Sequence, residues 1–286
     1  MRFLIIYIIS SILAAGAFSQ KDSMIRMETG FAEHLMHIGF YDDAIHVLGT
    51  VNPVSPLLAD TVSYLKGWSY YNLKQLDSAS FWLGNVGTTS AFFEKSLFFN
   101  SFCRIAAGEY SDASLLLSSY KPSSTTYLEL ARYQQAGISL LTRNINSFDS
   151  LSSSFTYNYY PVTDGEKNFV QYGNEIRIFK PRSMFLAGMF STCVPGLGKL
   201  YAGKPGEAAA AFLMVSALGL VTWENYRKDG PADPKTIIFG GMFTVFYIGN
   251  IWGSVFSIKF RRDEFNNETN HKILLDLHIP LRTIFN

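Results

Sequence analysis

The chain has 286 residues, which is room for about two domains of ordinary size. Its formal net charge is +1, so neither a basic surplus for nucleic acid nor an acidic surplus for a basic partner is present. Charged residues make up only 16% of the chain and aromatic residues 15%, a composition that fits a protein lying partly in lipid.

The first 19 residues predict a secretory signal peptide. Arg2 precedes an apolar run from Phe3 to about Leu13, and small residues follow up to Ser19. An uncleaved anchor helix is the alternative, but the apolar run is short for a membrane span. The segment that follows is therefore expected outside the cytoplasm.

Residues 20–160 contain an internal repeat of about 34 residues. Three segments align without gaps on a helix-turn-helix frame, in which Ala44, Ala79 and Ala113 coincide. Another small residue lies twelve positions before each alanine, at Ala32, Gly67 and Ser101. Small side chains at both positions let the two helices of a repeat approach closely. The pattern therefore predicts a stack of helix pairs.

Two glycines mark the ends of first helices in this frame. Gly39 and Gly108 stand where a left-handed cap residue is favoured. A fourth unit, from about Thr126 to Phe155, matches less well, because Asp149 stands where the repeat alanine is expected. We interpret this unit as the polar end repeat that such arrays need.

The pattern resembles the tetratricopeptide repeat over roughly residues 25–125. The resemblance implies a curved array whose first helices line a concave groove, here aromatic and nearly uncharged. Its positions on this sequence are Glu33, Met36, His37, Tyr64, Trp68, Tyr71, Asn72, Phe98 and Phe102. The Lys and Arg clamp that holds a peptide carboxylate in some relatives is absent, so an apolar helix or extended peptide is the expected ligand. The alternative is that these aromatic residues only pack against neighbouring helices.

Residues 198–205, GKLYAGKP, have the spacing of a phosphate-binding loop. Such a loop needs Ser or Thr after its lysine, but Pro205 follows Lys204 and offers neither a hydroxyl nor an amide hydrogen. The segment after Glu207 carries no charge for sixteen residues, whereas a soluble nucleotide-binding domain would show a polar face there. We therefore expect no nucleotide site.

The same region predicts a membrane module over residues 183–260. One apolar helix runs from Pro205 to about Trp223 and another from Thr236 to Ile258, and these are long enough, or nearly so, to cross the hydrocarbon core. A shorter apolar stretch before them is broken by PGLG, which predicts a half-helix that does not cross the bilayer. Basic residues lie both in the hairpin turn and after the second span, so the side of the C-terminus stays undecided.

The second span carries Gly241, Gly249 and Gly253 on one helical stripe. Gly249 and Gly253 form a GxxxG pair, which permits close backbone approach in lipid. The simplest partner is the first span at Gly219, and a homo-oligomer formed through Gly249 and Gly253 is the alternative. Asn250 is expected to hydrogen-bond within the hairpin.

The module also resembles the C-terminal membrane module of a family of bacterial envelope proteins. Members, common in Bacteroidetes-type bacteria, join periplasmic tetratricopeptide repeats to a paired-helix hairpin with a P-G-x-G-x-x-Y-x-G signature. The signature residues here are Pro195, Gly196, Gly198, Tyr201 and Gly203, followed later by Gly249, Asn250 and Gly253. The resemblance implies an inner-membrane protein with its repeats in the periplasm, but it implies no activity because the family has none established.

No catalytic, cofactor or metal site is predicted. His34 and His37 are one turn apart, but His46 belongs to another helix and no further ligand completes a site. The sequence also lacks HExxH, G-x-S-x-G and Cys/His nucleophile patterns. We therefore expect a protein that is not an enzyme.

The predicted fold class is all-α, a tetratricopeptide-like helical-repeat solenoid followed by a transmembrane helical hairpin. The predicted segments are a signal peptide (1–19), repeats (20–160), a linker (161–182), the membrane module (183–260) and a C-terminal tail (261–286). A strand, an amphipathic surface helix and a partner-bound extension all remain open for the tail.

The expected function is that of a membrane-anchored periplasmic scaffold that recruits a protein partner through the repeat groove. The alternative is a non-catalytic subunit of an envelope transport or membrane-insertion complex that acts through its hairpin. The expected partners are thus envelope proteins and the lipid bilayer, without nucleic acid.

Overall fold

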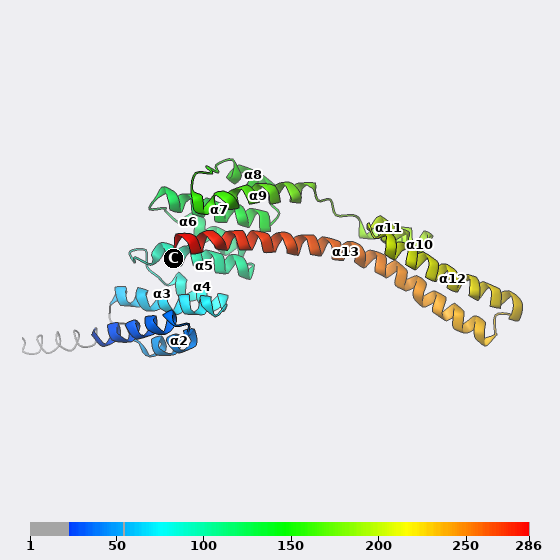
Figure 1. Cartoon of the computed structure of the whole chain (residues 1–286), viewed down its shortest axis with the longest axis horizontal. Helices are drawn as coiled ribbons and strands as arrows, with labels where there is room; N and C mark the ends of the chain where they lie inside the picture. The colour runs from blue at the N-terminus through cyan, green and yellow to red at the C-terminus, as the bar shows by residue number, and fades with distance from the viewer. Residues whose placement is uncertain (1–22, 54, 286) are drawn as a thin grey trace, which may run out of the picture. The chain divides into compact units, whose positions relative to one another are not determined.

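The structure, a computed structural model, describes residues 23–53 and 55–285. Throughout this part the chain is helical, with turns and loops but no strand (Figure 1). The all-α prediction is therefore confirmed. The predicted signal peptide, residues 1–19, lies outside the described residues.

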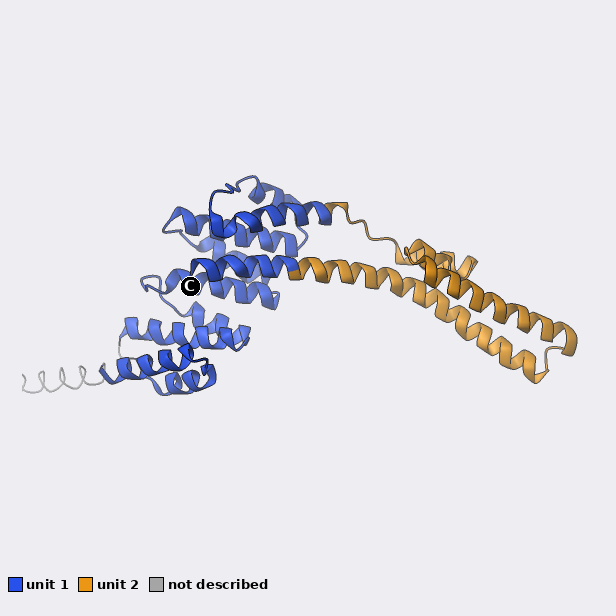
Figure 2. Ribbon diagram, in the orientation of Figure 1, with its two compact units in different colours: residues 1–176, 272–286 blue, residues 177–271 orange. Residues whose placement is uncertain are grey.

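The chain divides into two compact units (Figure 2). The first, here called the repeat unit, comprises Met1–Ile176 and Lys272–Asn286. The second, here called the membrane unit, comprises Arg177–His271. The chain thus leaves the repeat unit, builds the membrane unit and returns.

The repeat unit is a succession of helices in which neighbours along the chain pack together, α2 on α3, α3 on α4, α4 on α5, α5 on α6 and α7 on α8. Residues 23–37 are also helical. The other helices are α2 (Tyr41–Thr50), α3 (Pro56–Asn72), α4 (Leu76–Gly84), α5 (Phe93–Ala107), α6 (Tyr110–Ser119), α7 (Thr125–Leu141), α8 (Ile145–Ser152) and α9 (Tyr160–Ile178). The end of α13 completes the unit.

The small residues of the predicted frame lie where helices meet. Ala44, Ala79 and Ala113 are fully buried. A Cβ atom added at Gly67 would lie 2.7 Å from Cγ of Leu83, so this position tolerates no larger side chain without movement. The close approach of paired helices is therefore confirmed, while the tetratricopeptide assignment stays a prediction.

A residue with a left-handed backbone conformation follows the first helix of each sequence repeat. Gly39 and Gly108 have φ values of +88° and +87°, as predicted. Lys74 and Arg143 adopt the same conformation, with φ values of 62° and 60°. These four positions recur at intervals of 34 or 35 residues, so the backbone includes the weak fourth unit in the same period.

The predicted linker, residues 161–182, is wrong for most of its length. Residues up to Ile178 belong to α9, which packs into the repeat unit. Val162 and Phe169 are fully buried and Tyr172 is buried as well. These apolar residues recur at helical spacing among polar neighbours, which gives α9 one face for the core.

The predicted tail, residues 261–286, is a continuation of α13 (Pro234–Ile284). Its last part, residues 272–284, is here called the tail helix and belongs to the repeat unit. Ile273, Leu277 and Leu281 have 0% exposure. Of the three possibilities left open by the sequence, the tail is thus a helix, and one that is packed into a core.

The membrane unit contains α10 (Met184–Cys193), α11 (Leu197–Tyr201), α12 (Pro205–Asp229) and the earlier part of α13. Both α12 and α13 are long and apolar enough to cross a membrane, and only 11% of each apolar window is buried. The shorter apolar helix α10 ends at Cys193, because the next residue, Val194, is extended before Pro195. The predicted half-helix and two candidate spans are thus present as helices.

Candidate partner-binding groove and membrane module

Four of the predicted groove residues lie together on α3 and α5. The ring of Trp68 stacks with that of Tyr71 at 5.3 Å between centroids, and both meet Phe99 edge-on at 4.9 Å. Tyr64 extends the row beyond Trp68, and Phe102 extends it beyond Tyr71. Residues 64, 68 and 71 share one face of α3 because they are separated by four and three positions. Phe99 is a member of the row that the repeat frame did not predict.

Phe98 is a core residue and not an accessible groove residue. Its side chain is fully buried and packs against the rings of Tyr120 and Tyr127, at 5.6 and 5.9 Å. Its backbone carbonyl accepts a hydrogen bond from Nε2 of Gln134 at 3.2 Å. Because α7 packs against α5, this face of α5 is covered, and the packing alternative holds for Phe98.

The first repeat contributes the more open positions. Glu33 and His37 are exposed, while Met36 is half-buried against the core. Asn72, at the end of α3, donates a hydrogen bond to the backbone carbonyl of Trp68 at 2.8 Å. Its amide therefore caps its own helix.

A lysine that sequence reasoning missed lies over the aromatic row. The ammonium of Lys95 is 4.1 Å from the ring centroid of Trp68 and 5.6 Å from that of Tyr64, which are cation–π distances. Burial lowers the pKa of Lys95 and raises that of Tyr64 to about 12. The signal was present in the sequence, because Lys95 precedes Phe102 by seven residues and so shares its helix face.

The tail helix contacts the other end of the aromatic row, and Figure 1 shows the end of α13 beside α5 and α7. The hydroxyl of Tyr71 and Nε2 of His278 form a hydrogen bond, and the His278 ring stacks on Phe102 at 5.1 Å. Phe285 stacks on Tyr127 with centroids 5.9 Å apart. Part of the predicted groove is therefore occupied by the chain's own C-terminus.

The signature loop of the membrane unit is held by buried hydrogen bonds. The amide of Gly196 donates to Oδ1 of Asn250 at 3.1 Å, and that of Gly198 donates to Oγ of Ser191 at 3.1 Å. The Ser191 hydroxyl donates to Oγ of Ser254 at 2.6 Å, and Ser254 donates to the carbonyl of Asn250. These bonds satisfy loop amides that the break between α10 and α11 frees. The side chain of Asn250 was expected to hydrogen-bond within the hairpin, but it accepts its hydrogen bond from the loop between α10 and α11.

The signature glycines are required by space. A Cβ at Gly198 would lie 2.0 Å from the carbonyl oxygen of Ala187, and one at Gly196 would lie 2.3 Å from that of Ala208. Gly196 and Gly203 also have φ values of +86°. Pro195 is half-buried at the break.

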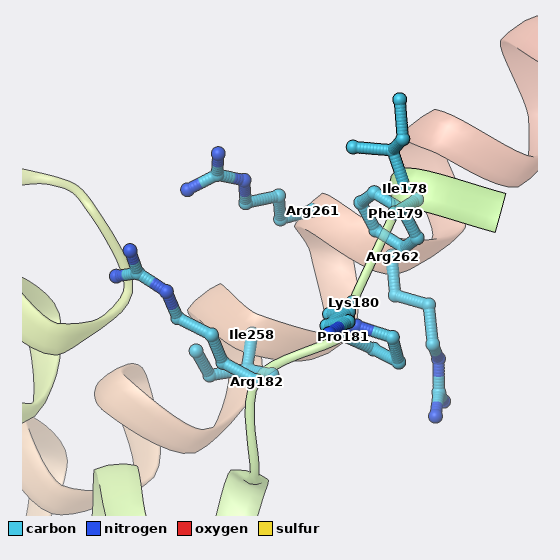
Figure 3. A pocket seen from close by; sticks show the side chains of 8 residues that line it. All are labelled: Ile178, Phe179, Lys180, Pro181, Arg182, Ile258, Arg261 and Arg262. Carbon is cyan, nitrogen blue, oxygen red and sulfur yellow. The ribbon is translucent and has the colours of Figure 1, made fainter. Parts of the chain in front are cut away.

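Tyr201 and two arginines close this loop. The Tyr201 hydroxyl accepts a hydrogen bond from the amide of Ser183 at 3.3 Å. Arg182 donates to the backbone carbonyl of Tyr201, and Arg261 donates to that of Ala202 at 3.0 Å. The two guanidinium groups extend to the same side in Figure 3. They belong to a basic pocket of about 330 Å³ that Lys180 also lines.

The glycine stripe does not make the predicted helix contact. A Cβ at Gly241 or Gly249 would meet nothing within 4 Å, and one at Gly253 would meet Cε of Lys199 at 3.5 Å. Gly219 on α12 does approach α13, since a Cβ there would lie 3.2 Å from the ring of Phe243. The GxxxG pair is therefore not the surface on which the two long helices meet. At Gly253 the neighbouring side chain is Lys199 from α11.

Within residues 23–53 and 55–285, no three His, Cys, Asp or Glu side chains gather as ligands for a metal ion. Cys103 is buried, and this burial raises the pKa of its thiol to about 12. Comparison of the chain with family models, curated proteins and solved structures gives no match.

Proposed function

We propose that the protein is a membrane-anchored interaction protein whose repeat unit recruits a protein partner through its aromatic groove. The hairpin anchors it in the inner membrane, and the tetratricopeptide-like repeats lie in the periplasm. The observation that supports this proposal is the packing of the tail on these rings, where His278 contacts Tyr71 and Phe102, and Phe285, just after the tail helix, stacks on Tyr127. Helix-in-groove recognition uses apolar side chains on one helix face in this way.

The membrane anchor is supported by α12 and α13, whose apolar side chains are mostly exposed. Such exposure is costly in water but favourable in hydrocarbon. Washing broken cells with salt and carbonate should leave the protein in the membrane, and detergent should release it. A periplasmic repeat unit should be cleaved by protease in spheroplasts, and the opposite orientation predicts protection.

Partner recruitment is tested with full-length protein in mild detergent. Trp68→Ala removes the centre of the aromatic row and the support for Lys95, so it should abolish capture of the partner that the natural protein retains. Leu115→Ala is the matched control, because Leu115 is 69% exposed on α6. Equal capture by both variants, with unchanged helical content, would contradict the proposal.

A second function rests on the broken helix pair. The buried hydrogen bonds of Ser191, Ser254 and Asn250 hold an interrupted backbone beside two long apolar helices. Interrupted helices of this kind occur in proteins that move substrates across membranes. A non-catalytic subunit of an envelope transport or insertion complex would retain its partners in Trp68→Ala but lose function in Ser254→Ala.

A further inference from the structure

The tail helix contains a proline, Pro280, in its interior. Because proline has no amide hydrogen, the backbone carbonyl of Asp276, four residues earlier, loses its helical donor. The hydroxyl of Tyr133 on α7 donates a hydrogen bond to this carbonyl at 2.9 Å. The repeat unit thus replaces the donor that the proline removes.

The side chain of the same residue is also bound. Oδ2 of Asp276 accepts hydrogen bonds from Tyr172 at 3.0 Å and from Asn168 at 3.1 Å, both on α9. The half-buried carboxylate is paired with two neutral donors at fixed positions. Asp276 is therefore recognised at its backbone by α7 and at its side chain by α9.

Two glycines without side chains leave the space that these contacts occupy. A Cβ at Gly137 on α7 would lie 2.8 Å from Cδ2 of Leu277, and a Cβ at Gly165 on α9 would lie 2.0 Å from the hydroxyl of Tyr133. Glycine weakens a helix interior, so each needs a packing reason to be there. Here one makes space for the bound leucine and the other for the donor that reaches the freed carbonyl.

From this geometry we propose that α7 and α9 form a recognition socket for a proline-interrupted amphipathic helix, which a protein partner presents in competition with residues 272–286. Counted from Ile273, the recognised pattern has aliphatic residues at positions one, five and nine, Asp at four and Pro at eight. This inference rests on the proposed function and names the class of partner segment. The tail helix is then an intramolecular ligand of the socket. Because it is covalently attached, its effective concentration at the socket is high.

The helical form of the tail brings these contacts together. Ile273, Leu277 and Leu281 lie on successive turns of one helix face, and all three are fully buried. The carbonyl of Asp276 is free only when a helix is interrupted by proline. The outer face of the tail helix lacks this complementarity, since Leu275 and Ile279 remain exposed there.

The test uses full-length protein in detergent and a fluorescent peptide with the sequence of residues 272–286. Leu277→Asp combined with Leu281→Asp releases the tail by placing two carboxylates in a buried face. The released chain should bind the peptide saturably by fluorescence anisotropy. The natural chain should bind it at least about tenfold more weakly, because its own tail competes.

A double-mutant cycle tests the recognition itself. Replacing Pro280 by Ala in the peptide restores its helical amide, and Tyr133→Phe in the released chain removes the hydroxyl donor. Tyr133→Phe should weaken binding of the natural peptide about fivefold and should leave binding of the alanine peptide nearly unchanged, because the restored amide already donates to the Asp276 carbonyl. Independent, multiplying effects would show that Tyr133 does not recognise the proline.

Other outcomes also decide the proposal. A chain that ends at Lys272 is the second released variant. If either folded variant fails to bind the peptide, or if both lose their helical signal, the tail is an obligate part of the repeat unit and the inference fails. If Trp68→Ala abolishes partner capture as proposed but the released chain does not bind the peptide, this inference alone is refuted. Peptide binding without partner capture refutes the proposed function and leaves the socket in place.

Discussion

The two units of the chain differ in the size of the side chains that they bury most completely. In the repeat unit, the largest fully buried side chains include Tyr133, Phe98, Phe99 and Phe169. In the membrane unit, Ser191 and Ser254 are fully buried and hydrogen-bonded to one another. Apolar side chains on α12 and α13 are exposed there, and Leu220 is 70% exposed.

This difference fits the proposed environments, water for the repeat unit and lipid for the two candidate spans. In water, burial of apolar area stabilises a fold, so aromatic rings fill the interior. In lipid, apolar burial contributes little, and small residues and hydrogen bonds hold helices together. The comparison predicts that substitutions of buried apolar residues are costly in the repeat unit and that changes of size and hydrogen bonding are costly in the membrane unit.

The largest effect should come from the apolar core of the repeat unit. Leu277→Ala leaves a cavity in the core beside Gly137 and should lower the free energy of unfolding of the repeat unit by about 2–5 kcal/mol. Leu275→Ala, on the exposed face of the same helix, should change stability by less than about 0.5 kcal/mol. Urea unfolding followed by circular dichroism gives both values. Similar values would mean that the tail helix does not contribute to the core.

In the membrane unit, the largest effect should come from an added methyl group. Gly198→Ala directs Cβ onto the carbonyl of Ala187 and should cost about 1–3 kcal/mol. Gly241→Ala meets nothing within 4 Å and should stabilise its helix by up to about 1 kcal/mol. The midpoint of thermal unfolding in detergent distinguishes the pair. A tolerated alanine at 198 would refute the steric role of the signature.

A smaller and opposite effect is expected at the left-handed turns. Lys74→Gly should stabilise the repeat unit by about 1 kcal/mol, because φ is positive there and a side chain is disfavoured. Gly108→Ala should destabilise it by about the same amount. Chemical denaturation of the two variants checks both signs. If Lys74→Gly destabilises the fold, the lysine side chain has a role that outweighs its backbone strain.

The smallest effect should be a pH dependence of tail docking. Burial, and then the charge of Arg282, lower the pKa of His278 below its ordinary value of 6.5. A lowered pKa means that the neutral form is favoured when docked, so docking is strongest above pH 6.5 and weakens as pH falls through the lowered value. Tyr71 and Phe102 face the ring and stay uncharged over this range.

The measurement is protease resistance of the tail between pH 7.5 and 5.5, with His278→Gln as the control that should flatten the dependence. Burial raises the pKa of Asp276, which favours docking at low pH. That contribution is complete only below its ordinary value of 3.8, outside the measured window. A tail that becomes more resistant as pH falls to 5.5 would contradict the assignment to His278.

Much of the fold could be predicted because small residues leave a clear signal. The repeat alanines and the cap glycines Gly39 and Gly108 set the period, and the long uncharged runs set the two candidate spans. The fourth repeat was harder to recognise in the sequence, because Arg143 occupies the left-handed position where glycine is expected. Helix α9 was missed because polar residues between its buried positions made it look like a linker.

The candidate site was predicted only in part. The row of Tyr64, Trp68 and Tyr71 follows from helical spacing, which local sequence contains. The socket at Tyr133 depends on a proline more than a hundred residues away in the chain, and no local pattern connects the two. The helix contact predicted for Gly249 and Gly253 is absent for a related reason. Lys199, which lies near Gly253, comes from another helix, and no local pattern indicates this contact.

The return of the chain into its first unit sets an order for biosynthesis. A ribosome adding about 5–20 residues per second must make the whole membrane unit, Arg177–His271, after the repeat helices are complete and before the last segment emerges. During those seconds, the surface that later receives Leu277 and Leu281 is apolar and uncovered. Newly made protein therefore passes through an interval in which a chaperone or a neighbouring nascent chain has access to that surface, and the packing of residues 272–285 ends this interval.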